Sequence, residues 1–140
     1  KSKAMTIQQL SVFLENKSGR LLEVTKVLGE NNINMSAFSI ADTSDFGMLR
    51  MIVDQPEAAF AALKKQNFSV SITPVVGLII PDKAGSLYHA LNALNDAAIE
   101  VEYMYAFSFK EDATVILRTA DAEKTAQVLK AANFQLISTK

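Results

Sequence analysis

The sequence predicts an α+β protein built from two copies of one small unit, each a four-stranded antiparallel sheet covered on one face by two helices. Two observations support this. Residues 9–73 match residues 75–139 when residue n is paired with residue n + 66, with identities at positions 17, 19, 21, 28, 33, 57, 63, 64, 67, 68 and 73. Each copy also repeats the same order of apolar patterns: strand, helix, strand, strand, helix, strand. This order is the split β-α-β arrangement of ferredoxin-like domains.

In the first copy, residues 9–15 form an apolar strand, and the spacing of apolar residues from Leu21 to Leu28 predicts a helix after a turn at residues 16–18. Two strands are expected at 33–43 and 47–53. Pro56 stands in the first turn of a second helix. Residues 68–72 close the copy as its last strand.

The second copy repeats these elements. Strands are expected at residues 76–80, 99–109, 114–119 and 134–138, and helices at 86–96 and 121–131, the latter capped by Asp121. Residues 73–75 read as a short linker. The predicted organisation is a tail at 1–8, one domain at 9–73 and a second at 74–140. Copies of this size sit near the lower limit for a stable core, so we expect them to pack on each other.

Composition excludes several classes of function. The 140 residues include 14 basic and 15 acidic side chains, so a basic surface for nucleic acid is not expected. The absence of cysteine excludes disulfides and thiolate metal sites and fits a cytoplasmic location. No apolar run is long enough to span a bilayer, so no membrane association is expected.

Catalysis has little support in the sequence. His89 is the only histidine and falls inside a predicted helix. No nucleophile elbow, metalloprotease motif or phosphate loop occurs. The sequence therefore predicts a protein that is not an enzyme and that needs no cofactor.

The turn between the first strand and first helix of each copy is the candidate site. Gly19 and Gly85 stand at the start of these helices, where backbone N–H groups lack helical acceptors and the helix dipole favours an anion. Asn16 and Asp82 precede the glycines by three residues and offer oxygens to an ammonium group. A zwitterionic ligand could therefore bind the helix start through its negative group and these oxygens through its ammonium group. The alternative is that the glycines only make turns, while Asn16, Asp82 and Ser18 cap the helices.

The turns Asn16–Leu21 and Asp82–Leu87, with the strand entries at 32–34 and 98–100, resemble those of the ACT domain, and the resemblance covers residues 8–139. It implies a stand-alone regulatory protein that binds an amino acid. It also implies two domains side by side as an eight-stranded sheet with four helices on one face, and a ligand at their seam. A homodimer and a partner enzyme in amino-acid metabolism are expected.

The resemblance also implies which residues bind. In serine-inhibited phosphoglycerate dehydrogenases, an asparagine precedes the glycine by three residues, and a second asparagine follows the first by 18 residues, as Asn16 and Asn34 do here. One seam site would join the Asn16 turn to Glu100, and the other would join the Asp82 turn to Asn34. A histidine of those enzymes is replaced by Leu14 and Ile80, so serine specificity is not supported. The expected ligand contacts are Asn16, Lys17, Ser18, Gly19, Arg20, Leu21, Asn34, Met35, Asp82, Lys83, Ala84, Gly85, Ser86, Leu87, Glu100 and Val101.

The strand at 99–109 is apolar on both faces, which predicts a covered second face. Alternation places Met104 and Ala106 on one face and Val101, Tyr103, Tyr105, Phe107 and Phe109 on the other. Tyr103, Tyr105 and Phe107 are the expected interface. The alternative function is therefore a protein-interaction or oligomerisation module with degenerate ligand sites. RNA binding would need further aromatic residues on the neighbouring strand and a basic surface.

Overall fold

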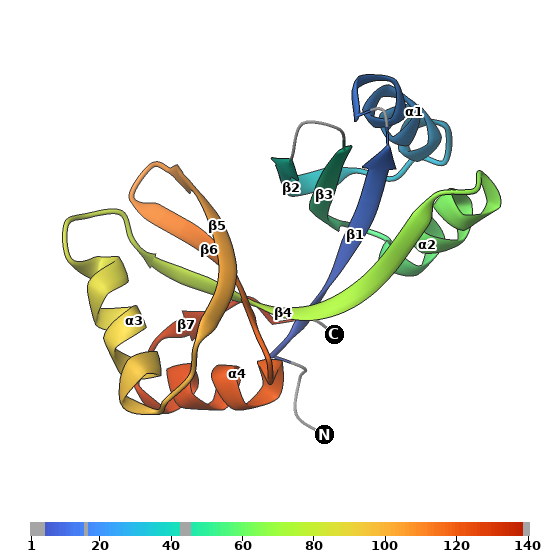
Figure 1. Ribbon diagram of the computed structural model, residues 1–140. Coiled ribbons are helices and arrows are strands. Elements are labelled where there is room, and N and C mark those ends of the chain that lie inside the picture. The colour runs from blue at the N-terminus through green and yellow to red at the C-terminus, as the bar shows by residue number, and fades with distance from the viewer. Residues whose placement is uncertain (1–4, 16, 43–45, 139–140) are drawn as a thin grey trace. The chain divides into compact units, whose positions relative to one another are not determined.

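The computed structural model describes residues 5–15, 17–42 and 46–138 (Figure 1). They divide into two compact units. The first unit is Gln8–Thr73, and the second contains the described residues 5–7 and 74–138. Met5 packs against the core of the second unit, so this unit is assembled from both ends of the chain.

The first unit contains nearly all of β1 (Ile7–Glu15), then α1 (Lys17–Glu30), β2 (Met35–Asp42), β3 (Phe46–Val53), α2 (Pro56–Lys65) and the beginning of β4 (Ser69–Pro81). Its strand order is β2-β3-β1-β4. Strand β3 is antiparallel to both of its neighbours, and Leu49 pairs with Val12 on one side and Ile40 on the other. Both helices cover the same face of this sheet (Figure 1).

The second unit contains the end of β4, α3 (Ser86–Asp96), β5 (Val101–Phe109), β6 (Asp112–Thr119), α4 (Ala122–Ala131) and the short β7 (Gln135–Leu136). Its order is β5-β6-β4, with β7 paired to the other side of β4. The predicted α+β class with two ferredoxin-like units is confirmed.

The predicted linker at residues 73–75 is wrong. These residues lie inside β4, which runs unbroken from Ser69 to Pro81, so the described residues form seven strands. A proline such as Pro74 is tolerated in a strand wherever its missing N–H is not needed by the ladder. Val75 and Val76 beside it are buried and β-branched, which favours the extended backbone.

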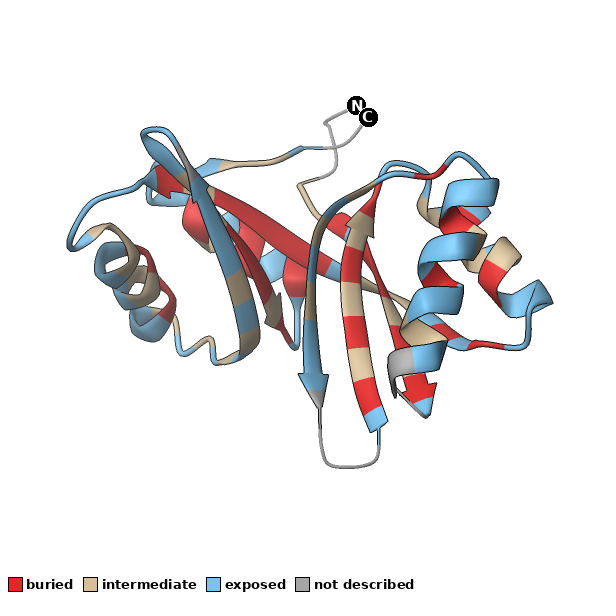
Figure 2. Ribbon diagram, turned by 90° about the horizontal axis from the view of Figure 1, so that it is seen from above, coloured by how far each residue is buried: buried red, intermediate tan, exposed pale blue. Residues whose placement is uncertain are grey.

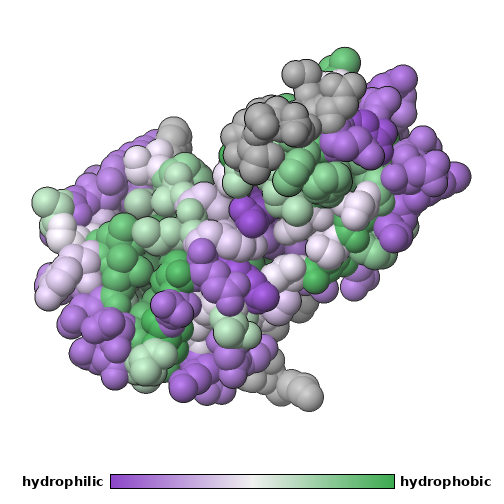
Figure 3. Space-filling view, in the orientation of Figure 1, coloured by the Kyte–Doolittle hydropathy of each residue, from purple (hydrophilic) through white to green (hydrophobic). Residues whose placement is uncertain are grey.

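Each unit has its own apolar core between its sheet and its helices. Buried and half-buried residues alternate along β1 and β3, and the buried sides of the helices face the strands (Figure 2). Hydrophilic residues cover the outer surface around α2 (Figure 3). The larger buried side chains are Leu10, Leu14, Leu28, Leu49, Met51 and Leu63 in the first core, and Leu78, Leu94, Leu117 and Leu129 in the second. No helix among the described residues is long and apolar enough to cross a membrane.

An irregularity in β5 changes which residues share a face. The pairing register shifts between Val101 and Tyr103, so Val101 opposes Thr119 and packs against the helix-side core. The prediction that Val101 faces the same way as Tyr103 is wrong, because one extra residue in a strand inverts the alternation beyond it. The register of β2 shifts at the equivalent place, between Met35 and Ala37.

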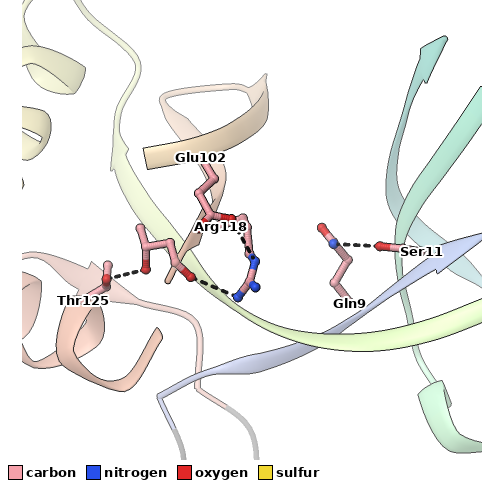
Figure 4. A network of polar contacts seen from close by, with 6 residues as sticks. Gln9, Ser11, Glu102, Arg118 and Thr125 are labelled. Atoms are coloured by element: carbon pink, nitrogen blue, oxygen red, sulfur yellow. Dashed lines mark hydrogen bonds and ion pairs between the residues drawn. The ribbon is translucent and has the colours of Figure 1, made fainter. Parts of the chain in front are cut away.

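Thr119 and Thr125 are both buried, and their hydroxyl oxygens lie 2.6 Å apart, joining β6 to α4 (Figure 4). The Thr125 hydroxyl also donates to the Asp121 carbonyl. The Lys124 N–H donates to the Asp121 carboxylate at 3.1 Å, which confirms the predicted cap of this helix.

Every helix is followed by a residue with a left-handed backbone. These residues are Asn32, Asn67, Ala98 and Asn133, with φ between 57° and 69°. After α3, the N–H of Ile99 donates back to the Leu94 carbonyl at 2.9 Å, which satisfies the end of the helix. Asparagine adopts this conformation readily, whereas alanine does so at a cost.

Replacing Ala98 by asparagine should therefore stabilise the protein by about 1 kcal/mol, because the left-handed backbone disfavours alanine by roughly this amount. Urea unfolding measures the change in the free energy of unfolding. Ala132→Asn is the matched control, since Ala132 has a negative φ of −88° and should gain nothing. Equal effects of the two substitutions would contradict this account.

Gly77 permits the close approach of the chain end to β4. A β-carbon added there would lie 2.8 Å from Ile137 Cδ1 and 3.2 Å from its Cβ, while Ile137 N–H donates to the Gly77 carbonyl. Gly77→Ala should cost about 1–3 kcal/mol of stability through overpacking. Gly29→Ala, in a helix with open space around it, should stabilise by about 0.5–1 kcal/mol. Adding Ile137→Ala should recover part of the Gly77→Ala loss, and no recovery would count against this contact.

Candidate ligand-binding turns

The first candidate turn joins β1 to α1. Asn16 lies outside the described residues. Helix α1 begins at Lys17, so the backbone of Lys17, Ser18 and Gly19 forms its first turn. The sequence predicted a turn at 16–18 with the helix after it, whereas the structure places residues 17 and 18 in the helix.

The second candidate turn joins β4 to α3 and has a different backbone. The Asp82 N–H donates to the Glu111 carbonyl at 2.7 Å, and the Ser86 N–H donates to the Lys83 carbonyl at 3.2 Å. Gly85 has a φ of 91°, a left-handed conformation that favours glycine. Nothing lies within 4 Å of the place where its β-carbon would be. Asp82, Lys83, Ala84 and Gly85 are all exposed.

The helices after these two turns differ electrostatically from the other two. Helices α2 and α4 carry Glu57 and Glu123 in their first turns, and α4 is capped by the Asp121 carboxylate. Helices α1 and α3 have no acidic residue in the first turn, and no side chain caps α3. The partial positive charge at their starts is therefore not offset by a neighbouring carboxylate of the helix itself.

The N–H groups of Leu87 and Tyr88 point out of the start of α3 without helical acceptors, since the first helical bond is that of His89 to Gly85. This arrangement suits an anion such as a carboxylate.

Arg20 is held by neighbours that the sequence analysis did not single out. Its Nη1 lies 2.6 Å from Glu23 Oε1 and its Nε lies 3.3 Å from Glu15 Oε1. The Nε contact is an ion pair without hydrogen-bond geometry. The guanidinium carbon stacks 3.8 Å from the centre of the Phe68 ring. Arg20 and Glu23 are three residues apart in a predicted helix, and this spacing could have predicted their ion pair.

Several predicted contact residues serve the cores. Leu21 and Met35 pack against the first core, and Leu87 and Val101 against the second. Asn34 and Glu100 are exposed at the entries to the second strands. The backbone N–H of Asn34 already donates to the Asp54 carboxylate at 3.1 Å, so it is not available to a ligand.

The predicted interface residues share one face of β5. Tyr103, Tyr105 and Phe107 pair across to Arg118, Ile116 and Thr114 of β6. Phe107 is exposed and the two tyrosines are half-buried. At the start of this face, Arg118 Nε lies 3.5 Å from Glu102 Oε1 (Figure 4).

A shallow hollow of about 350 Å³ was not predicted. It lies at the start of α2 and is lined by Gln8, Gln55, Pro56, Glu57 and Ala58. Gln8 is at the opposite end of β1 from the first turn. The carboxylate of Glu57 makes this helix start a poorer place for an anion than the starts of α1 and α3.

Comparison with solved structures finds close and distant likenesses. The chain is 47% identical to protein BT0572 from Bacteroides thetaiotaomicron, with a TM-score of 0.94, covering 98% of this chain and 95% of that one. The regulatory subunit of aspartate kinase from Thermus thermophilus, in its ligand-free form, is 15% identical with a TM-score of 0.65, covering 94% and 97%. That of Thermus flavus is 15% identical with a TM-score of 0.59, covering 95% and 99%. These last two likenesses show the fold alone.

No curated protein matches the sequence. The family model described as an ACT domain pair matches residues 5–140, which is nearly the whole chain. The chain therefore belongs to the ACT domain family, as a pair of ACT domains.

Proposed function

We propose that this protein is a regulatory module that binds an amino acid at the strand-to-helix turns of its ACT domains, without catalysis of its own. Membership of a regulatory family supports the general role. The regulatory subunits with the same fold belong to aspartate kinases, which favours a partner enzyme in amino-acid metabolism.

The observation that carries the proposal is the contrast among the four helix starts. Helices α2 and α4 meet their partial positive charge with their own carboxylates, while α1 and α3 do not. An incoming carboxylate therefore has two starts at which it gains from the dipole and from unpaired N–H groups.

The second turn also offers a partner for an ammonium group. Asp82 is exposed, precedes Gly85 by three residues and carries a carboxylate. Gly85 leaves open space above the helix start, so a ligand can approach the backbone closely. A carboxylate and an ammonium group a few ångströms apart are the shared feature of free α-amino acids. The expected participation of Glu100 and Asn34 stays a prediction.

Calorimetric titration with each of the twenty amino acids should find at least one that binds. The carboxamide of that amino acid, which keeps the ammonium group and the side chain, should bind at least about tenfold more weakly, a difference of ~1.4 kcal/mol. The reason is that the helix start binds the negative charge. Equal affinity for the acid and its amide would contradict the proposal, as would binding of none of the twenty.

Gly85→Ala tests the location of that site. The added methyl group enters the open space at the helix start, and the left-handed backbone strains it, so affinity for the bound amino acid should fall. Gly29→Ala is the matched control, because Gly29 also has open space around it but lies at the end of α1. Thermal unfolding of both variants shows whether each stays folded.

We also propose that a second copy of this chain pairs with the exposed edge of β2. Phe38 is 61% exposed and Ile40 is 39% exposed, although both lie on the helix side of the sheet opposite Met51 and Leu49. The counterpart of Phe38 in β5, Met104, is 41% exposed. Strand β2 has no lysine, arginine or proline, the residues that protect an edge from pairing. Exposed apolar residues of this kind mark interfaces.

Phe38→Lys should therefore convert a dimer into a monomer in light scattering coupled to gel filtration, because it puts a charge on the pairing edge. Lys26→Ser, on the exposed side of α1, should leave the dimer intact. A wild-type protein that is monomeric at high concentration would contradict this second proposal.

A further inference from the structure

The two candidate turns have the same place in the repeat but different structures. Helix α1 has 14 residues and begins at Lys17, whereas α3 has 11 residues and begins at Ser86. Ser86 is the counterpart of Arg20. The first copy therefore forms one additional helical turn, in the segment where the second copy has an open turn ending in the left-handed Gly85.

Four residues of the first copy are in contact beside this turn, and we name them the Arg20 clamp: Glu15, Arg20, Glu23 and Phe68. Arg20 reaches Glu15 at the end of β1 and Glu23 one turn further along α1. It also stacks on Phe68, which is 3% exposed and directly precedes β4. Only 24% of the Arg20 side chain is exposed, so these contacts are partly shielded from water. The clamp ties the beginning of α1 to both flanking strands.

The second copy cannot form this clamp. The counterparts of Glu15, Arg20 and Glu23 are Pro81, Ser86 and His89. Both carboxylates and the guanidinium are missing, and only the aromatic residue is kept, as Phe134. The difference in backbone therefore follows a difference in sequence.

The additional turn moves the unpaired N–H groups. In α1, the helical pattern pairs the N–H of Leu21 with the carbonyl of Lys17. The equivalent residue, Leu87, is in the first turn of α3, where no helical acceptor exists. The free amides of the first copy thus lie one helical turn earlier, a shift of roughly 5 Å along the axis. One ligand cannot make the same set of contacts at both turns.

We propose that the Arg20 clamp makes the two ligand sites unequal: it holds the Gly19 turn in its helical form and leaves the Gly85 turn as the tighter site. Arg20 acts here as a positioning residue, through the backbone of residues 17–19. The inference rests on the proposed function for its ligand, but the clamp itself is testable without one.

The ligand-free experiment compares the wild type with Arg20→Ser by NMR. Carbon chemical shifts of residues 17–19 should be helical in the wild type and should lose helical character in Arg20→Ser, while those of residues 24–28 remain helical. Lys26→Ser, an exposed position of the same helix, should keep the helical shifts of 17–19. Helical shifts that persist in Arg20→Ser would overturn the clamp, whatever the protein binds.

The ligand experiment uses calorimetry with the amino acid that binds best. The wild type should show one tight event and a second that is at least about tenfold weaker. Gly85→Ala should remove the tight event, and Arg20→Ser should bring the two affinities closer together by several fold. A purely structural role of Arg20 would lower the unfolding temperature without changing that ratio. Two equal sites in the wild type, or an unchanged ratio in Arg20→Ser, would overturn the inference, whereas binding of no amino acid would overturn the proposed function.

Discussion

The constraint that organises this protein is that the first N–H groups of a helix have no acceptor within it. The four helices meet this constraint differently. Helices α2 and α4 bring carboxylates to their own starts, with Asp121 making a direct bond to the Lys124 N–H. The first helix of each unit brings none. Both of these helices come after a strand in the middle of a sheet: α1 begins at Lys17 after β1, and α3 begins at Ser86 after β4 and the exposed residues 82–85.

The two copies share the fold of the repeated unit but differ in the residues at the starts of their first helices. The residues shared by both copies include core leucines such as Leu28 and Leu94 and the aromatic pair Phe68 and Phe134. The residues around the helix starts differ in charge between the copies. An arginine between two glutamates in one copy becomes a serine between a proline and a histidine in the other. The same fold therefore presents one clamped turn and one open turn.

The sequence predicted the order of elements because each strand and helix carries its own periodicity and the repeat tests every assignment twice. The sequence-based prediction failed where a single residue decides the backbone geometry. Residues 73–75 were expected to form a linker but lie within β4, and the register shift at Glu102 inverted the face of Val101. The turns were found from Gly19 and Gly85, yet their unequal backbones depend on contacts of Arg20 with residues far along the chain, such as Phe68. Contacts of this kind produce no periodic pattern in the sequence.

The most direct test of the central claim, that an amino-acid carboxylate binds at the start of the first helix of a unit, is the response of the glycine amides in proton–nitrogen correlation spectra. The chain has only five glycines, and Gly29 and Gly77 lie elsewhere in the fold as internal references. On saturation with an amino acid that binds, the account predicts that the Gly85 amide shifts most and that Gly29 and Gly77 stay in place. Saturation that shifts neither Gly85 nor Gly19 would contradict it.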